Sequence, residues 1–284
     1  MRHAYLIMAH GEWELLNNLV KALDDPNNDI YLHIDKKSKF DKHILVYPQY
    51  SKLFLTRRMN VNWGGDSQVK CILKMLTLAS KCNYRYYHLL SGVDIPIETQ
   101  ENIHHFFTYN DGKNYLSFDF KNDYAETRLR EYHFFQNIIG RNNGHIVALF
   151  YYIEQHLINI QKKLGVNRLK NSHIRFYKGG GWFSITNDLV FVLLKNKKMI
   201  KKYFYHSLCP DELFIHTIAK NSSLEHTIVN DDLRYIDWNR GTPYIFRDED
   251  YEAICNSGKL FARKFSFKVD KKIIHKLYGR LNVI

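Results

Sequence analysis

The sequence has no long apolar run, and this bounds the class of protein. The apolar run between Met1 and His10 is too short for a signal-peptide core, and no later segment reaches the roughly 18 apolar residues that a membrane span needs. The 284 residues are 45% hydrophobic, without an internal repeat, a low-complexity tract or a linker rich in Pro, Gly or Ser. We therefore expect one globular, cytoplasmic protein with a substantial core.

Cysteine is also scarce. Cys71, Cys82, Cys209 and Cys255 are scattered along the chain without any C-x-x-C pair. This spacing indicates neither a zinc site nor a disulfide framework. We expect buried, reduced thiols.

Acidic residues are outnumbered, with 29 Asp and Glu against 41 Lys and Arg, for a net charge of +12. Residues 161–178 hold six bases and no acid, and residues 259–280 hold eight bases and the single acid Asp270. Such a surface attracts phosphates, nucleic acid or lipid headgroups, or else serves only as a solvated face. The aromatic and basic run at 261–265 is a single cluster, too little to make nucleic acid an expected partner.

The first 120 residues alternate short apolar strands with amphipathic helices, which is typical of a mostly parallel α/β sheet. The pattern predicts a helix at 12–23 and another that starts with Ser67 as its N-cap. The predicted strands are Tyr5–Ala9, Ile30–Ile34, Lys52–Thr56 and Tyr86–Leu90.

The second half differs in texture. From about Asn122 to Lys170 the sequence is aromatic, basic and helical, which predicts an insertion or a helical layer over the sheet. Strands are expected at 174–177 and 182–185, on either side of Gly179–Gly181, followed by helices at 188–197 and 211–220. The remainder reads as short strands and a closing basic helix.

Ligands of open α/β sheets bind beyond the carboxyl ends of the strands. His10 follows the first predicted strand and Asp35 closes the second. A carboxylate there is placed to accept hydrogen bonds from a uracil imide or from ribose hydroxyls. The alternative for Asp35 is an ordinary turn residue.

Three glycine-containing segments are further candidates. Trp63 and two glycines stand directly before a helix N-terminus, a place that favours a polar or anionic ligand, although the spacing matches neither G-x-G-x-x-G nor the P-loop. Residues 89–96 form a similar strand-to-loop transition with an acid, Asp94. Trp182 follows three glycines and is either a stacking platform for a sugar or a core residue.

Acidic pairs occur at two places. Asp211 and Glu212 follow Pro210 where an apolar helical pattern begins, so a carboxylate there is either a base or ordinary helix-start chemistry. Asp248 and Asp250 form a D-x-D pattern, which holds a divalent metal in many nucleotide-sugar enzymes but also fits a solvated turn or cap.

Taken together and in order, these segments resemble the core-2/I-branching N-acetylglucosaminyltransferase family, which also contains the peptide O-xylosyltransferases. The matching segments run from residue 4 to residue 265. They are Ala4–Ile7 with His10, Tyr31–Asp35, Trp63–Gly65 with Ser67, His88–Gly92 with Asp94 and Pro96, Lys178–Gly179 with Trp182, Pro210–Glu212, Ile236–Trp238 and Phe261–Phe265.

The resemblance implies a GT-A-like fold, with a Rossmann-type, mostly parallel sheet, helices on both faces and a helical insertion. It implies a single domain over 1–284, with a nucleotide-binding half at 1–120 and an acceptor-side half with a basic C-terminal segment at 121–284. The implied activity is inverting transfer from a UDP-sugar without a divalent metal or other cofactor.

The resemblance also implies roles for individual residues. Glu212 is the expected base that deprotonates the acceptor hydroxyl. Lys264 is expected to neutralise the leaving diphosphate, with Arg263 adjacent and Arg240 in a loop that aligns poorly.

The remaining expected contacts divide between donor and acceptor. His10, Asp35 and Trp63 are expected to hold the nucleotide. The expected acceptor contacts are Trp238, Asp211, Trp182, Arg128 and Arg130.

This chain departs from the animal members because it shows no membrane anchor, stem or lumenal disulfide pattern. We hypothesise a bacterial cytoplasmic enzyme of surface polysaccharide synthesis, peripheral on an anionic inner membrane face, with a glycan or lipid-linked glycan acceptor. The expected donor sugar is N-acetylglucosamine in β linkage, with xylose as the alternative. Two other hypotheses stay open: a non-catalytic basic module that binds nucleic acid or anionic polymer, and a metal-dependent transferase that uses Asp248 and Asp250.

Overall fold

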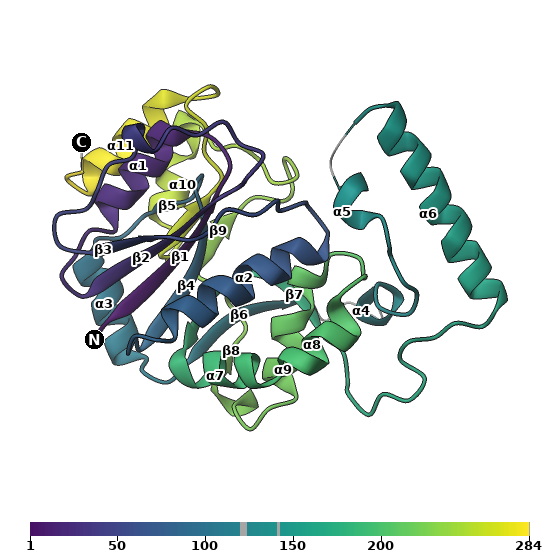
Figure 1. The fold of residues 1–284 in the computed structure, drawn as a ribbon. Coiled ribbons are helices and arrows are strands. Elements are labelled where there is room, and N and C mark those ends of the chain that lie inside the picture. The colour runs from purple at the N-terminus through teal and green to yellow at the C-terminus, as the bar shows by residue number, and fades with distance from the viewer. Residues whose placement is uncertain (120–123, 141–142, 284) are drawn as a thin grey trace.

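A computed structural model of the chain describes residues 1–119, 124–140 and 143–283. Over these residues a seven-stranded sheet forms the centre of the molecule, in the order β3-β2-β1-β4-β7-β6-β8 (Figure 1). Its strands are β1 (His3–Ala9), β2 (Asn28–Ile34), β3 (Lys52–Leu55), β4 (Tyr86–Ser91), β6 (Asn114–Asp119), β7 (Lys178–Thr186) and β8 (Ile228–Val229).

The sheet is mostly parallel. Strands β3, β2, β1 and β4 run parallel to one another, β7 is antiparallel to both of its neighbours, and β8 is parallel to β6. Strands β2 and β4 are buried along their whole length, as expected for parallel strands covered on both faces. The mixed α/β architecture predicted from the sequence is therefore confirmed.

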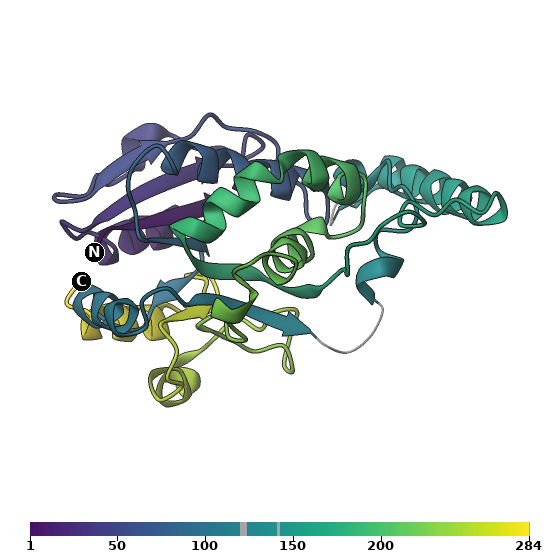
Figure 2. The same cartoon turned by 90° about the horizontal axis from the view of Figure 1, so that it is seen from below.

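Helices cover both faces because side chains alternate along each strand. On β1, Ala4 and Leu6 pack toward one face, with α2, α7 and α9, whereas Tyr5 and Ile7 pack toward the other, with α1 and α3. Figure 2 shows the two layers on either side of the sheet. The helices of these layers are α1 (Trp13–Ala22), α2 (Asp66–Ala79), α3 (Gln100–Tyr109), α7 (Asn187–Lys195), α8 (Lys197–Phe204) and α9 (Phe214–Lys220).

A second, three-stranded sheet has the order β5-β10-β9 and packs with the C-terminal helices around a third apolar cluster. Its strands are β5 (Ile95–Pro96), β9 (Arg234–Ile236) and β10 (Phe261–Arg263). The helices beside it are α10 (Tyr251–Cys255) and α11 (Lys271–Arg280), and short 3-10 turns lie at η1 (Lys42–Ile44), η2 (Pro210–Glu212), η3 (Glu225–Thr227) and η4 (Asp248–Asp250).

The helical insertion expected from about Asn122 to Lys170 is present, although Asn122 itself lies outside the described residues. It contains α4 (Tyr124–Thr127), α5 (Gln136–Ile139) and α6 (His145–Lys163), and α6 lies at the side of the molecule, beyond α5 (Figure 1). Within the part of the chain that the structure describes, no helix is both long enough and apolar enough to cross a bilayer.

Several local predictions are wrong. Gly179–Gly181 lie inside β7 rather than between two strands, and residues 174–177 are not a strand. A methyl group at Gly179 would collide with the carbonyl oxygen of Ser117 on β6, so the glycine permits the close approach of two strands. Helix α2 begins at Asp66 after Gly65, so Ser67 is not its N-cap.

Two predicted helices are also divided. The predicted helix 188–197 ends at Lys195, and α8 follows it directly. The predicted helix 211–220 begins as the 3-10 turn η2 and continues as α9. Of the cysteines, Cys71 and Cys209 are buried and Cys82 and Cys255 are half-buried, and none of these four described residues forms a disulfide.

Candidate functional site

The candidate residues gather along one edge of the large sheet. Strands β2, β1 and β4 end there at Ile34, Ala9 and Ser91. Strand β7 is antiparallel to β4, with Phe183 opposite Leu89, so the segment just before Phe183 lies at the same edge. This is the edge where ligands bind in open α/β sheets.

At the ends of β1 and β2, His10 and Asp35 are close neighbours. The Asp35 amide donates to the Ala9 carbonyl at 2.9 Å, and Ser38 Oγ donates to the His10 carbonyl at 2.8 Å. The Asp35 side chain is buried and accepts from the backbone amides of Lys37 at 2.8 Å and Val61 at 3.1 Å. Asp35 therefore fixes the loop before Trp63, while the side chains of His10 and Trp63 are exposed.

The Trp63 loop is joined to the acidic turn η2. Gly64 has a φ of +70°, a conformation that glycine adopts at little cost, and its amide donates to Gln68 Oε1 at 2.6 Å. The Cys209 amide donates to the Gly64 carbonyl at 2.8 Å, and Gln68 Nε2 donates to Asp211 Oδ2 at 3.1 Å. The loop that carries Trp63 and the turn that carries the two carboxylates thus form one unit.

The two adjacent carboxylates of η2 have different surroundings. Glu212 Oε2 accepts from Arg128 Nη1 at 2.6 Å, in a partly exposed ion pair. Asp211 Oδ1 is buried and, within the described residues, has no hydrogen-bond partner. Burial, reinforced by the neighbouring Glu212, raises the pKa of Asp211 to about 7. A buried carboxyl with a raised pKa beside a partly exposed, ion-paired carboxylate is typical of sites that move protons.

Trp182 and Arg263 occupy the middle of the edge. The Arg263 guanidinium lies 4.0 Å from the centre of the Trp182 ring, and its Nη1 is 3.3 Å from Oδ1 of the fully buried Asp94. Asp94 also accepts from the hydroxyl of Ser91 at 2.6 Å and from its amide at 2.8 Å. Arg263, expected on a diphosphate, thus has its charge balanced by a carboxylate of the protein and orients the indole.

Gly181 connects the indole to the acidic turn. A methyl group at Gly181 would lie 3.4 Å from Asp211 Oδ2, and Trp182 is the next residue along β7. The Arg263–Trp182 pair and the acidic turn therefore lie close together at this edge.

The other two predicted diphosphate cations lie on adjoining segments. Lys264 is half-buried directly after β10, and its carbonyl accepts from the Phe246 amide at 3.0 Å. Arg240 lies 4.1 Å over the ring of Tyr244 and is ion-paired with Asp237 at 2.5 Å and with Asp250 at 2.7 Å. Arg240 is therefore engaged by two carboxylates.

The predicted acceptor contacts are placed unevenly. Trp238 is exposed, on the loop that follows β9, and Arg128 contacts Glu212 directly. Arg130 is exposed, and its backbone oxygen accepts from the Arg168 amide at 3.0 Å. Among the described residues, Arg128 thus contacts the acidic turn and Arg130 does not.

The D-x-D carboxylates already have cationic partners. Asp248 is ion-paired with Lys272 at 2.5 Å and with Lys276, and Asp250 is paired with Arg240. Over the described ranges, no cluster of three or more His, Cys, Asp or Glu side chains is arranged to hold a metal ion. The carboxylates of Asp248 and Asp250 therefore fit helix-start and ion-pair roles better than a metal site.

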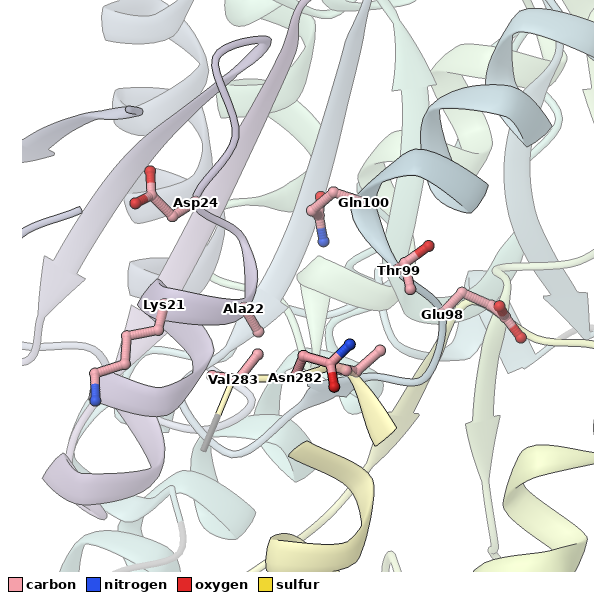
Figure 3. A pocket seen from close by; sticks show the side chains of 9 residues that line it. Lys21, Ala22, Asp24, Glu98, Thr99, Gln100, Asn282 and Val283 are labelled. Carbon is pink, nitrogen blue, oxygen red and sulfur yellow. The ribbon is translucent and has the colours of Figure 1, made fainter. Parts of the chain in front are cut away.

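A cavity of about 320 Å³ lies at the opposite edge of the sheet (Figure 3). Its lining includes Asp24, Glu98 and Gln100, and Gln100 accepts from Asn28, the first residue of β2, at 2.8 Å. The cavity is therefore separate from the candidate site at the carboxyl edge.

Sequence reasoning missed two residues that hold the site together, and it did not predict the partner of a third, Asp94. Gln68 binds Asp211, Asp94 binds Arg263, and the buried Arg234 donates to backbone carbonyls of β4 and β7. Asp94 had a signal, because it stands in a strand-to-loop transition. Gln68 and Arg234 carry no motif, and only the fold reveals their partners.

Comparison with known proteins gives one consistent result. The chain is 24% identical over 318 residues to Xylosyltransferase 2 of Canis lupus familiaris and 25% identical over 312 residues to Xylosyltransferase 1 of Homo sapiens. Each alignment covers 98% of this chain but only 34% and 30% of those relatives, so the chain spans about a third of their length. The family model for the Core-2/I-Branching enzyme matches residues 3–261, and the chain belongs to that family.

Proposed function

We propose that the protein is an inverting glycosyltransferase that moves a sugar from a UDP-sugar to a hydroxyl of a glycan, without a divalent metal. The observation that carries the proposal is the junction of Gln68 with Asp211, because it joins the Trp63 loop to the acidic turn at one edge of the sheet. A nucleotide bound beside His10 and Trp63 thereby has carboxylates within the same unit. Family membership supports the same reaction class.

In the proposed mechanism, Glu212 removes the proton of the acceptor hydroxyl as that oxygen attacks the anomeric carbon. Arg128 orients the carboxylate through the hydrogen bond at 2.6 Å. The bond from the anomeric carbon to the diphosphate breaks on the opposite face, which inverts the configuration. The departing diphosphate gains negative charge, and Lys264 supplies the compensating charge in the position that a metal ion holds in other transferases.

The donor is proposed to be UDP-N-acetylglucosamine, with a β-linked product. UDP-xylose is the second candidate, and the names of the aligned relatives favour it. Trp182 is proposed to stack on the apolar face of a sugar, because Arg263 orients its ring at the edge of the site. Trp238 and Asp211 are proposed to complete the acceptor side.

The acceptor is proposed to be a glycan or a lipid-linked glycan, reached from the cytoplasmic face of a membrane. The net charge of +12 supports contact with anionic lipid. Cell fractionation tests the location: recovery in a membrane fraction that high salt releases supports it, and recovery with secreted protein contradicts it.

A thermal-shift and hydrolysis panel of nucleotide sugars, with and without EDTA, tests the activity. The proposal predicts stabilisation by UDP and one UDP-sugar, and hydrolysis that EDTA leaves unchanged. Loss of hydrolysis with EDTA and its recovery with manganese would indicate metal dependence instead. Steeply salt-dependent binding to DNA or RNA without UDP affinity would favour a non-catalytic basic module.

A further inference from the structure

Helix α6 exposes apolar side chains on the side that faces away from the body. The side that packs on the body is partly polar: Glu154 and Gln161 are buried there together with Ile158. A surface helix normally buries its apolar side and exposes its polar side. On α6, by contrast, apolar side chains on the outer side stay exposed within the described residues.

Specific polar contacts hold this orientation. Glu154 Oε2 accepts from the Phe135 amide at 3.1 Å, and His133 Nδ1 lies 3.4 Å from Glu154 Oε1. The Gln161 amide group exchanges two hydrogen bonds with the backbone of Tyr132, at 2.8 and 2.9 Å. Rotation of α6 to hide its apolar side would break these bonds and expose buried polar groups, which is unfavourable.

The exposed side carries an apolar stripe, which we define as Ile146, Leu149, Tyr152 and Ile160. At 100° per residue these four fall within an arc of roughly 120°, on the side away from Glu154 and Gln161. Ile146 and Tyr152 are each 70% exposed and Leu149 is 56% exposed. Exposed apolar side chains gathered on one side of a helix mark an interaction site.

The charge around the stripe identifies the partner. Residues 143–176 contain five bases and one acid, and that acid is the buried Glu154. Lys162 and Lys163 end the helix and are exposed, as is Lys170. An apolar face bounded by lysines suits the interface of an anionic bilayer, where the apolar side enters the acyl boundary and the lysines meet lipid phosphates.

A second basic feature lies on the same helix layer. Figure 2 shows α6 continuing the layer formed by α2, α7 and α8 on one side of the sheet. A cavity of about 680 Å³ between α2 and α8 is lined by apolar residues that include Leu55 and Leu73, and none of its described lining residues is acidic. Its basic lining residues are Arg57, Lys70, Lys74, Lys81, Lys197 and Lys201.

We infer that α6 docks the protein on anionic phospholipid membranes through its apolar stripe, with Lys162 and Lys163 at the lipid phosphates. A second copy of this chain fits the surface less well, because pairing would bring two chains of charge +12 together. The inference rests on the proposed function only in placing the acceptor at a membrane.

Cosedimentation with vesicles of phosphatidylcholine and phosphatidylglycerol tests the inference, with pure phosphatidylcholine vesicles as the neutral comparison. We expect binding to the anionic vesicles only. The triple variant Ile146→Ser, Leu149→Ser, Tyr152→Ser should lose at least about tenfold in affinity. A matched triple, Tyr47→Ser, Tyr50→Ser, Phe191→Ser, removes exposed apolar groups elsewhere and should bind like the wild type. The pair Lys162→Glu, Lys163→Glu should also weaken binding.

Equal vesicle binding by the α6 triple variant would overturn the inference, as would no binding by the wild type. Sedimentation equilibrium distinguishes the rival occupant: a wild-type dimer that the triple variant makes monomeric, with unchanged vesicle binding, assigns the stripe to a second copy. Vesicle binding needs no donor, so it can succeed even if UDP-sugar turnover is absent. Transfer to a water-soluble acceptor should be the same in wild type and triple variant.

Discussion

Arg128 Nη1 donates to Glu212 Oε2 at 2.6 Å, and this bond joins the helical insertion to the acidic turn at the sheet edge. The two residues are separated by 84 positions in the chain. Because the pair is partly exposed, its contribution to folding stability is small, on the order of 1 kcal/mol or less. Its main effect is to hold one rotamer of the carboxylate that the proposed mechanism uses as a base.

Replacement of Arg128 by Met should therefore lower turnover while it leaves stability nearly unchanged. We expect a decrease of about tenfold or more in kcat, since a misplaced base transfers the proton less efficiently. Steady-state kinetics and thermal denaturation measure the two effects. Lys170→Met removes an exposed cation of the same insertion and serves as the control. A large loss of stability with normal kcat would contradict the positioning role.

The Arg263–Asp94 pair should behave as a buried ion pair. Asp94 is fully buried and Arg263 nearly so, with 3.3 Å between Nη1 and Oδ1. Arg263→Met leaves a buried carboxylate without its cation, so unfolding free energy should fall by about 3 kcal/mol or more. The double variant Arg263→Met, Asp94→Asn should recover part of that loss. Denaturant titration of the wild type, the single variants Arg263→Met and Asp94→Asn, and the double variant checks this. Strictly additive losses of unfolding free energy would contradict the pairing.

The raised pKa of Asp211 predicts a pH-dependent stability. Between about pH 4 and 7 the folded protein holds a proton on Asp211 that the unfolded chain has released, so this residue lowers stability as pH rises. Asp211→Asn removes the effect and should become steadily more stable relative to wild type across this range, by at most about 4 kcal/mol. Thermal denaturation from pH 4 to 8 measures the difference. A constant difference would show that Asp211 titrates normally.

A cluster of buried histidines predicts the opposite slope in acid. His88 contacts Ser184 Oγ at 2.8 Å and His3 Nδ1 at 3.1 Å, and the rings of His3 and His104 are 4.3 Å apart. Burial lowers the pKa of His3 to about 2, and it lowers the pKa values of His88 and His104, although Asp25 near His104 opposes the shift there. Below pH 6.5 the unfolded chain binds protons that the folded protein does not, so stability falls as pH falls.

His3→Gln should flatten that acid slope. The variant takes up one proton fewer on unfolding, so the slope of unfolding free energy against pH falls by at most about 1.4 kcal/mol per pH unit. Denaturant unfolding at several pH values between 4 and 6.5 gives the slope directly. The same slope in the variant and in the wild type would contradict a neutral His3.

The sequence predicted the parallel part of the fold well, because β1, β2 and β4 are short apolar runs separated by amphipathic helices. It did less well at β7, where three glycines suggested a turn. Those glycines allow β6 to approach, and that contact involves a partner more than 60 residues away. Local patterns carry no information about such a partner.

The candidate site shows the same contrast between local patterns, which the sequence reveals, and contacts between distant segments, which it does not. His10, Asp35 and Glu212 could be named from their places at strand and helix ends, and the structure puts them at one sheet edge. Asp94 and Arg128 could also be named, but their contacts with Arg263 and Glu212 could not be predicted, because these contacts join distant segments of the chain. Gln68, which binds Asp211, carries no motif. The ion pairs of Arg240 with Asp250 and of Arg263 with Asp94 likewise depend on the fold, because no spacing rule predicts these pairings.

The most direct test of the proposed chemistry compares Glu212→Gln with wild type in UDP affinity and in sugar transfer. Glu225→Gln, in an exposed ion pair with Lys220, is the matched control. The proposal predicts unchanged UDP affinity by calorimetry and a decrease in kcat of about 10²–10⁴-fold for Glu212→Gln alone. Full turnover by Glu212→Gln would contradict the assignment of the base.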